Sequence, residues 1–477
     1  MREVDSIEGF VDWVATGAVG PVAVQALDLR KHTGLLCDLK AHGSLFLGCE
    51  MDLMAAGHLV TGGAIVVPEL PGAYAVHRAR LYRAEELYSG YDPDHPETFE
   101  QCLDTRIYEQ FLAEGGEGAC SMKVTFHRAL HDHSITEALT DVLRGHRVVA
   151  VMGGHGLERS SPRYGEIVRL AKRLAEQSYV LVSGGGPGAM EATHLGVWLS
   201  GRPDSVVQEV LDGPFTQRPA DGEPGREYLD PDWLARAWRV REQWPKQSKA
   251  LCVGIPTWLY GHEPPTPFAT YIAKYFANSV REDGVLGIAG HGIVFARGSA
   301  GTTQEIFQDA CQNHYGTMGS RSPMILLDQH YWTHTRPVWP LLRAVSKDEI
   351  YGELVVLVNS GDEAVHHIQQ YEPSWYVVSL DEFETLESNL RRLLRLRSNW
   401  VFTHTSADPP DAAPEAEPGR ALADWLFALG DDNWFAYARA VEVGEELLTD
   451  ARVWKDPRGL VVQLGERVIL WMARLDD

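Results

Sequence analysis

One stretch of this chain, a buried strand followed by a glycine turn and a helix, constrains its fold more than any other. Tyr179–Val182 has the apolar residues of a buried strand, and Ala189–Leu199 has a helical pattern. Glycine permits a tight turn and lets another group approach the backbone closely. The free N–H groups at the start of the helix point into the turn, so we predict a phosphate site there. Its residues are Gly184, Gly185, Gly186, Gly188 and Met190.

A second stretch has the same order of strand, turn and helix. Gly292–Ala296 predicts a strand, and Thr303–His314 predicts a helix. The turn between them is built from small and hydroxyl residues that would offer backbone amides to the same phosphate. These are Gly298, Ser299, Gly301, Thr302 and Thr303. We expect the fold to bring the two turns together.

Strand and helix patterns alternate from Arg147 onwards, which is typical of a parallel sheet with helices on both faces. The fold class predicted is therefore α/β, with a Rossmann-like doubly wound sheet. Ligands of such sheets bind beyond the carboxyl ends of the strands, where both turns fall. The remaining strands are expected at 148–152, 250–255, 323–327 and 354–358, and the remaining helices at 164–177, 233–244 and 268–281.

The chain divides into four predicted parts. Residues 1–144 form an α+β region, with strands at 22–29 and 63–67 and helices at 108–114 and 127–143. Residues 145–400 form the Rossmann-like domain, and a linker rich in Pro, Ala and acidic residues covers 401–419. Residues 420–477 form a small C-terminal domain. Its aromatic residues indicate either docking on another surface or a small core of its own.

Composition excludes several classes of function. A formal net charge of −23 argues against a nucleic-acid polymer as partner. We find no membrane-spanning apolar run, and the charged N-terminus lacks the apolar segment of a secretory signal. The six scattered cysteines predict reduced, mostly buried thiols, and so a cytoplasmic protein. His127, His131 and His133 are interpreted as a solvated or capping helix face rather than metal ligands.

Several residues have a structural interpretation beside the functional one. The spacing Gly184-x-Gly186-x-x-Ala189 fits the dinucleotide fingerprint only in part, which leaves NAD binding as an alternative. Glu305 ends a Thr302–Glu305 capping box, so it would serve either the helix or catalysis. Arg281 is placed at a helix end, where the dipole alone favours a cation. The aromatic residues of 257–262 would stack on a base or pack under a loop.

Together the two turns resemble the motifs of the LOG family, the nucleoside 5′-monophosphate phosphoribohydrolases. Gly184–Ala192 is similar to the first motif of this family, and Gly298–Glu305 is similar to the second, Pro-Gly-Gly-x-Gly-Thr-x-x-Glu. The resemblance covers residues 145–330, and the flanking regions resemble the larger bacterial pyrimidine/purine nucleotide nucleosidases in layout. Two departures stand out, because Arg297 replaces the Pro of the second motif and Ser299 replaces its second Gly.

The resemblance implies hydrolysis of the N-glycosidic bond of a nucleoside 5′-monophosphate to a free base and ribose 5-phosphate. It implies Glu305 as the catalytic carboxylate, a catalytic arginine for which Arg281 is the candidate, and a homo-oligomer. No metal and no cofactor are expected. No lysine stands in a recognisable pyridoxal phosphate setting, so nothing supports lysine decarboxylation. A non-catalytic nucleotide sensor on the same fold is the alternative.

Overall fold

The computed structural model describes residues 2–371, with gaps at 16, 18–19, 69–71, 119, 145, 219–222, 316–320 and 348. Beyond 371 it describes four strands at 400–403, 451–456, 459–464 and 467–474. The predicted linker at 401–419 and the aromatic helical stretch after it lie almost wholly outside the described residues. The chain separates into two compact units. One comprises Met1–Leu143, Ala150–Val285 and Ala296–Thr302, and the other comprises Arg144–Val149, Leu286–Phe295 and Thr303–Asp477.

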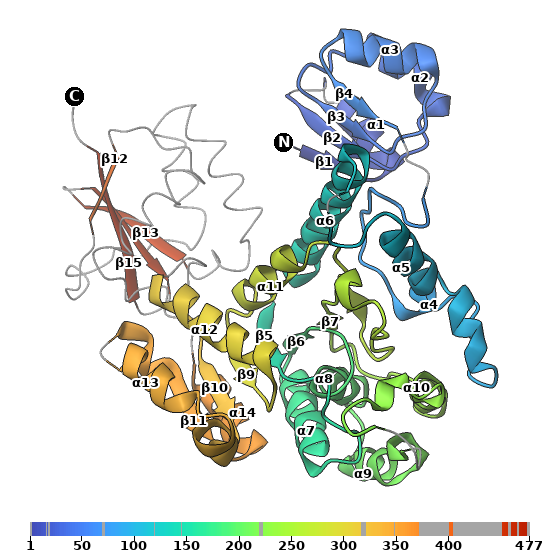
Figure 1. Cartoon of the computed structure of the whole chain (residues 1–477). Helices are drawn as coiled ribbons and strands as arrows, with labels where there is room; N and C mark the ends of the chain where they lie inside the picture. The colour runs from blue at the N-terminus through green and yellow to red at the C-terminus, as the bar shows by residue number, and fades with distance from the viewer. Residues whose placement is uncertain are drawn as a thin grey trace. The chain divides into compact units, whose positions relative to one another are not determined.

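The N-terminal region is a small four-stranded sheet in which all strands run parallel (Figure 1). The order is β1 (Arg2–Val4), β2 (Val22–Gln25), β3 (Leu45–Leu47) and β4 (Ile65–Val67). Helices α1 (Ile7–Ala15), α2 (Thr33–Asp38) and α3 (Leu53–Thr61) alternate with the strands. Strands β2 and β4 lie within the predicted ranges 22–29 and 63–67 but are shorter, and β1 and β3 were not predicted.

Three helices link this sheet to the central one: α4 (Ala84–Leu87), α5 (Leu103–Ala113) and α6 (Met122–Leu143). On α6 the interpretation of a solvated histidine face is wrong for two residues, because His127 and His131 are buried. His131 bonds Tyr82 through Nε2 at 2.9 Å and Asp132 through Nδ1 at 3.0 Å. Among the described residues, no group of three or more His, Cys, Asp or Glu could hold a metal ion.

The central sheet has seven parallel strands in the order β11-β10-β9-β5-β6-β7-β8, which confirms the predicted doubly wound α/β class (Figure 1). From β5 the chain first adds β6 to β8 on one side and then returns to add β9 to β11 on the other. The order therefore reverses beside β5, where ligands of such sheets bind. The bounds are β5 (Arg147–Met152), β6 (Tyr179–Ser183), β7 (Cys252–Gly254), β8 (Tyr271–Ile272), β9 (Ile293–Phe295), β10 (Met324–Leu327) and β11 (Val355–Val358).

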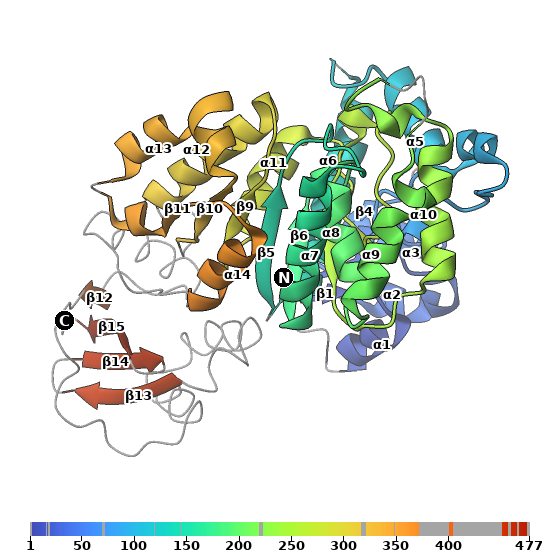
Figure 2. The same cartoon turned by 90° about the horizontal axis from the view of Figure 1, so that it is seen from below.

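Helices α7 (Pro162–Glu176) and α8 (Ala189–Trp198) lie side by side against the sheet (Figure 2). They pack so closely that a β-carbon on Gly196 of α8 would overlap the Val168 carbonyl of α7. The first unit also contains α9 (Asp204–Asp212), α10 (Asp232–Gln243) and most of α11 (Asn278–Gly287). Helix α12 (Ala300–Tyr315) begins in the first unit, and the second unit also contains α13 (Trp339–Ser346) and α14 (Gly361–Gln370).

The helix predicted at 268–281 is wrong. Its middle forms the edge strand β8, and α11 begins only at Asn278. The apolar residues of this stretch have a spacing that suits a helix, but the backbone pairs with β7 instead. Ala273 N–H, for example, donates to the Gly254 carbonyl at 2.8 Å. Sheet pairing thus overrides the local pattern.

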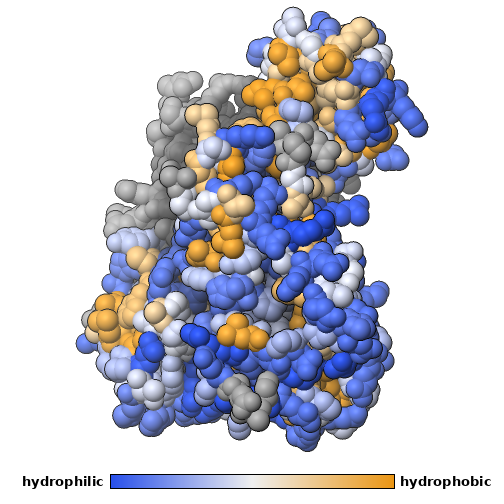
Figure 3. Space-filling model, turned by 45° about the vertical axis from the view of Figure 1, so that its right-hand side comes forward, coloured by the Kyte–Doolittle hydropathy of each residue, from blue (hydrophilic) through white to orange (hydrophobic). Residues whose placement is uncertain are grey.

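The described part of the chain contains no helix that is long and apolar enough to cross a membrane. The face shown in Figure 3 is mostly hydrophilic, with hydrophobic residues in separate patches. The six cysteines are unpaired, and Cys49, Cys102 and Cys252 are buried. A short C-terminal antiparallel sheet has the order β12 (Trp400–Thr403), β15 (Arg467–Arg474), β14 (Gly459–Leu464) and β13 (Ala451–Asp456).

Candidate functional site

The first glycine turn connects β6 to α8 and is held tightly by its neighbours. Gly188 has φ +71°, and a β-carbon on it would lie 2.5 Å from the Gly154 carbonyl oxygen. That oxygen accepts the Ala189 N–H at 3.2 Å, so this amide of the helix start is already paired. Gly185 has φ +72°, and its N–H donates to Ser183 Oγ at 3.1 Å. Only glycine fits these two positions without strain.

The two predicted turns meet at a third glycine turn, which is formed by Gly153 and Gly154 at the end of β5. A β-carbon on Gly153 would lie 2.7 Å from Cβ of Ala189, which starts α8, and 3.1 Å from Cβ of Ala296. Gly154 N–H donates to the Arg297 carbonyl at 2.9 Å. The two turns therefore lie on either side of the β5 end, where the order of the strands reverses.

Arg281 reaches the first turn from α11. Its Nη2 is 3.4 Å from the position that a β-carbon on Gly184 would take, and its Nε donates to the Ile255 carbonyl at 3.0 Å. The side chain is buried. Arg281 is the fourth residue of α11, not the last of a helix as predicted. Because a helix start disfavours a cation, the helix dipole does not explain an arginine at this position.

The start of α11 is fixed from outside by Asp132 of α6. Its Oδ1 accepts the Phe276 N–H at 2.9 Å, and its Oδ2 accepts the Ala277 N–H at 2.8 Å. These two N–H groups immediately precede α11. A buried carboxylate that pairs with two backbone amides holds them firmly, so Asp132 positions the helix that carries Arg281.

A carboxylate absent from our sequence prediction, Glu263, also faces the first turn. Its Oε2 lies 3.5 Å from the position of a β-carbon on Gly186, and its Oε1 is 3.3 Å from His155 Nδ1. Burial raises the pKa of Glu263, while the nearby His155, His262 and Arg281 act in the opposite direction. A carboxyl group with a raised pKa beside a glycine turn is suited to exchange protons with a ligand.

The second turn is more open than the first. Ser299 and Gly301 are exposed, and a β-carbon on Gly301 would meet no atom within 4 Å. Gly298 is different, because a β-carbon there would overlap the buried side chain of Thr302. Helix α12 begins at Ala300, so Thr302 already lies within it and does not cap it. Thr303 and Glu305 follow in α12 and are half-buried.

The capping-box interpretation of Glu305 is therefore wrong, because the box requires Thr302 to precede the helix. The aromatic residues of 257–262 were predicted either to stack on a base or to pack under a loop, and the structure distinguishes two of them. Trp258 is buried and stacks on Phe276, with ring centroids 4.5 Å apart, so it packs in the core. Tyr260 is 43% exposed, so stacking on a base stays a prediction for this residue.

A buried ion pair holds the start of α8, the helix that follows the first turn. Glu191 of α8 accepts hydrogen bonds from Arg159 Nε at 2.8 Å and from Arg159 Nη2 at 2.6 Å. Tyr164 OH also donates to Glu191, at 2.8 Å. The Arg159 guanidinium lies 4.1 Å from the centroid of the Phe215 ring. These groups are buried and satisfy one another, so we assign the network a structural role.

Ser183 and His194 form a second buried pair that resembles a nucleophile and its base. Ser183 Oγ lies 2.8 Å from His194 Nε2, and both residues are buried. Burial lowers the pKa of His194 to about 3, so the ring stays neutral near pH 7. Since Ser183 Oγ also accepts the Gly185 N–H, the pair supports the turn from within.

Sequence reasoning missed the contributions of Gly153, Gly154 and Glu263. Two glycines after the predicted strand at 148–152 were a usable signal for the third turn. Glu263 had no such signal, because the path of the loop between β7 and β8 brings it to Gly186.

Fold and site together define a Rossmann-like α/β protein with three glycine turns at the carboxyl ends of its strands. Comparison with family models finds no match, and no curated protein matches either. Among solved structures, the chain is similar to a molybdenum cofactor binding protein from Rippkaea orientalis, with 14% identity and a TM-score of 0.29. It is also similar to a molybdenum cofactor carrier protein from Chlamydomonas reinhardtii, with 12% identity and a TM-score of 0.29. The matches cover 47% of this chain and 96% and 97% of those chains. TM-scores below 0.5 carry no weight in assigning a function.

Proposed function

We propose that this protein hydrolyses the N-glycosidic bond of a nucleoside 5′-monophosphate and releases the free base and ribose 5-phosphate. One observation carries the proposal. The first glycine turn has a buried guanidinium, Arg281, beside Gly184 and a carboxyl group of raised pKa, Glu263, beside Gly186. The turn thus combines a cation for an anionic substrate group with an acid for a leaving group.

Each group has a chemical task in this reaction. Cleavage of the bond from C1′ to the base nitrogen develops positive charge on the ribose ring, as in glycoside hydrolysis generally. Protonated Glu263 donates its proton to the departing base, and the water that bonds to C1′ gives up a proton to the Glu305 carboxylate. Glu305 keeps the role that the motif resemblance implies, which is to stabilise the charge and orient that water.

Phosphate binding is the task of Arg281 and the backbone amides of the turns. Because Gly185 and Ala189 N–H are paired within the protein, the arginine carries more of this binding than our sequence prediction assigned to it. Binding energy gained at the phosphate positions the distant glycosidic bond for cleavage.

The test is to incubate the full chain with AMP, GMP, CMP, UMP and IMP and to detect free base by chromatography. We expect release from at least one nucleotide, and a loss of roughly 10²–10⁴-fold in kcat for Glu305→Gln and for Glu263→Gln. Nucleotide binding, measured by calorimetry, should persist in both variants. Exposed Glu242→Gln is the matched control and should leave the rate unchanged.

The departures at Arg297 and Ser299 support a second candidate, a non-catalytic nucleotide sensor. Tight binding without turnover of any nucleotide would favour it over the enzyme. Binding of NAD near Gly184, with no response to Glu305 substitution, would instead favour an NAD-dependent oxidoreductase.

A further inference from the structure

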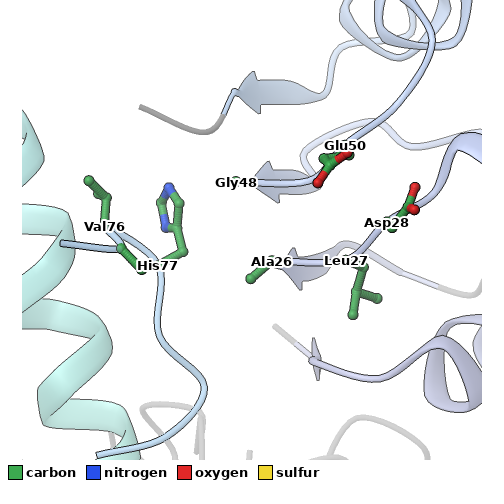
Figure 4. A pocket seen from close by; sticks show the side chains of 8 residues that line it. Ala26, Leu27, Asp28, Gly48, Glu50, Val76 and His77 are labelled. Carbon is green, nitrogen blue, oxygen red and sulfur yellow. The ribbon is translucent and has the colours of Figure 1, made fainter. Parts of the chain in front are cut away.

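The N-terminal sheet contains a cavity of about 260 Å³ at the carboxyl ends of β2 and β3 (Figure 4). This is the end of a parallel sheet at which α/β proteins bind ligands. It belongs to a different sheet from the glycine turns, so the proposed function leaves it without a task. Its lining residues are Ala26, Leu27, Asp28, Gly48, Glu50, Ala75, Val76 and His77.

His77 is the feature that points to a ligand. It is only 6% exposed, and neither ring nitrogen has a hydrogen-bond partner among the described residues. Buried polar side chains are nearly always paired, so an imidazole with two unpaired nitrogens in the wall of a cavity calls for a partner. Burial lowers the pKa of His77 to about 4, so near neutral pH the ring offers one N–H donor and one nitrogen acceptor.

Gly48 fixes the position of this ring. Its φ is +63°, and a β-carbon on it would lie 2.7 Å from His77 Cδ2. The imidazole therefore packs directly on the backbone at the end of β3 and has little freedom to turn away. Glycine at this position serves both the backbone conformation and the close approach of the ring.

The charges at the cavity select the chemistry of the ligand. Arg30 bridges the two acidic lining residues, with Nη2 2.6 Å from Asp28 Oδ2 and Nη1 2.8 Å from Glu50 Oε2. Two carboxylates and one guanidinium leave a net negative charge, which disfavours a phosphate. Carboxylate oxygens accept further N–H or O–H groups, while Leu27 and Val76 offer apolar surface.

We propose that this cavity is a second ligand site, which binds a free nucleobase or nucleoside without a phosphate. The heterocycle pairs one polar atom of its edge, an N–H or a ring nitrogen, with a nitrogen of His77, and its remaining N–H or hydroxyl groups face Glu50 and Asp28. The volume is below the usual range for drug-sized ligands, which suits a single heterocycle with or without a sugar.

The test is calorimetric titration of the full chain with adenine, hypoxanthine, cytosine, uracil and their ribonucleosides, alongside AMP and ribose 5-phosphate. We expect at least one base or nucleoside to bind, and His77→Phe to weaken that binding at least tenfold while the melting temperature shows a folded protein. His42→Phe is the matched control. His42 also packs against a glycine of positive φ, Gly63, but it is exposed and does not line the cavity.

Two further variants keep the result decisive. Exposed Glu50→Gln should weaken binding several-fold even if His77→Phe does not fold. Arg281→Ala should leave base binding unchanged, because Arg281 belongs to the glycine turns, so failure of the nucleosidase proposal does not decide this one. The proposal is overturned if no base or nucleoside binds, if binding ignores both lining variants, if Arg281→Ala abolishes it, or if AMP or ribose 5-phosphate binds more tightly at His77.

Discussion

His155 Nδ1 lies 3.3 Å from Glu263 Oε1 at the mouth of the first glycine turn. His155 follows the glycines that end β5, and Glu263 comes from the loop between β7 and β8. The contact therefore joins the loops of two strands that are not neighbours in the sheet. It places a carboxyl group of raised pKa, Glu263, beside Gly186.

Replacing Glu263 by Gln should change how stability depends on pH. Burial raises the pKa of Glu263 above its ordinary value of 4.5, so the folded protein keeps this proton to a higher pH than the unfolded chain does. As the pH rises above 4.5, the unfolded chain releases the proton first, and the contribution of Glu263 to stability falls. The free energy of unfolding of Glu263→Gln, relative to the unsubstituted protein, should therefore increase with pH. Urea unfolding between pH 4.5 and about 8 measures this, and a difference that stays flat would contradict it.

Replacing Arg281 by Ala should weaken nucleotide binding by about 1.5–3 kcal/mol, the range for a hydrogen bond to a charged group. Arg281→Lys keeps the charge but loses the planar guanidinium that bonds Ile255, so it should restore only part of the affinity. Exposed Arg297→Ala is the control and should have the smaller effect. Equal losses in the two alanine variants would show that Arg297 also binds the phosphate.

Gly188 and Gly301 should respond in opposite ways to the same change. Gly188→Ala places a β-carbon 2.5 Å from the Gly154 carbonyl oxygen at a positive φ, so it should lower stability by about 2 kcal/mol or more. Gly301→Ala meets open space within α12, so it should be neutral or stabilise by up to about 1 kcal/mol. Melting temperatures and urea unfolding of the two variants give the comparison. Loss of nucleotide binding in a stable Gly301→Ala variant would show close contact of the ligand with that turn.

Removal of Glu191 should destabilise the protein without any chemical role in the site. Glu191→Ala leaves the buried Arg159 guanidinium without its carboxylate, which costs about 3–5 kcal/mol when a buried pair is broken. Glu223→Ala breaks an exposed pair with Arg226 and should cost less than about 1 kcal/mol. Similar unfolding curves for the two variants would mean that the buried network does not stabilise the turn.

The strands of the central sheet were predictable, because buried parallel strands are continuous apolar runs and glycine marks their ends. Edge strand β8 was not, since its two residues gain their conformation only by pairing with β7. The first turn was predictable from its own residues. Glu263 was not, because only the folded loop brings it to Gly186. The placement of Arg281 was half right, in that the residue reaches the turn but from the start of a helix.

The bonds from Asp132 to the amides before α11 have a consequence for how the site responds to the rest of the molecule. Asp132 lies in the middle of the 22-residue helix α6, which is remote in sequence from both glycine turns. These bonds fix the amides that precede α11, and Arg281 follows them within about one helical turn. The placement of the guanidinium therefore depends on a carboxylate that belongs to another helix.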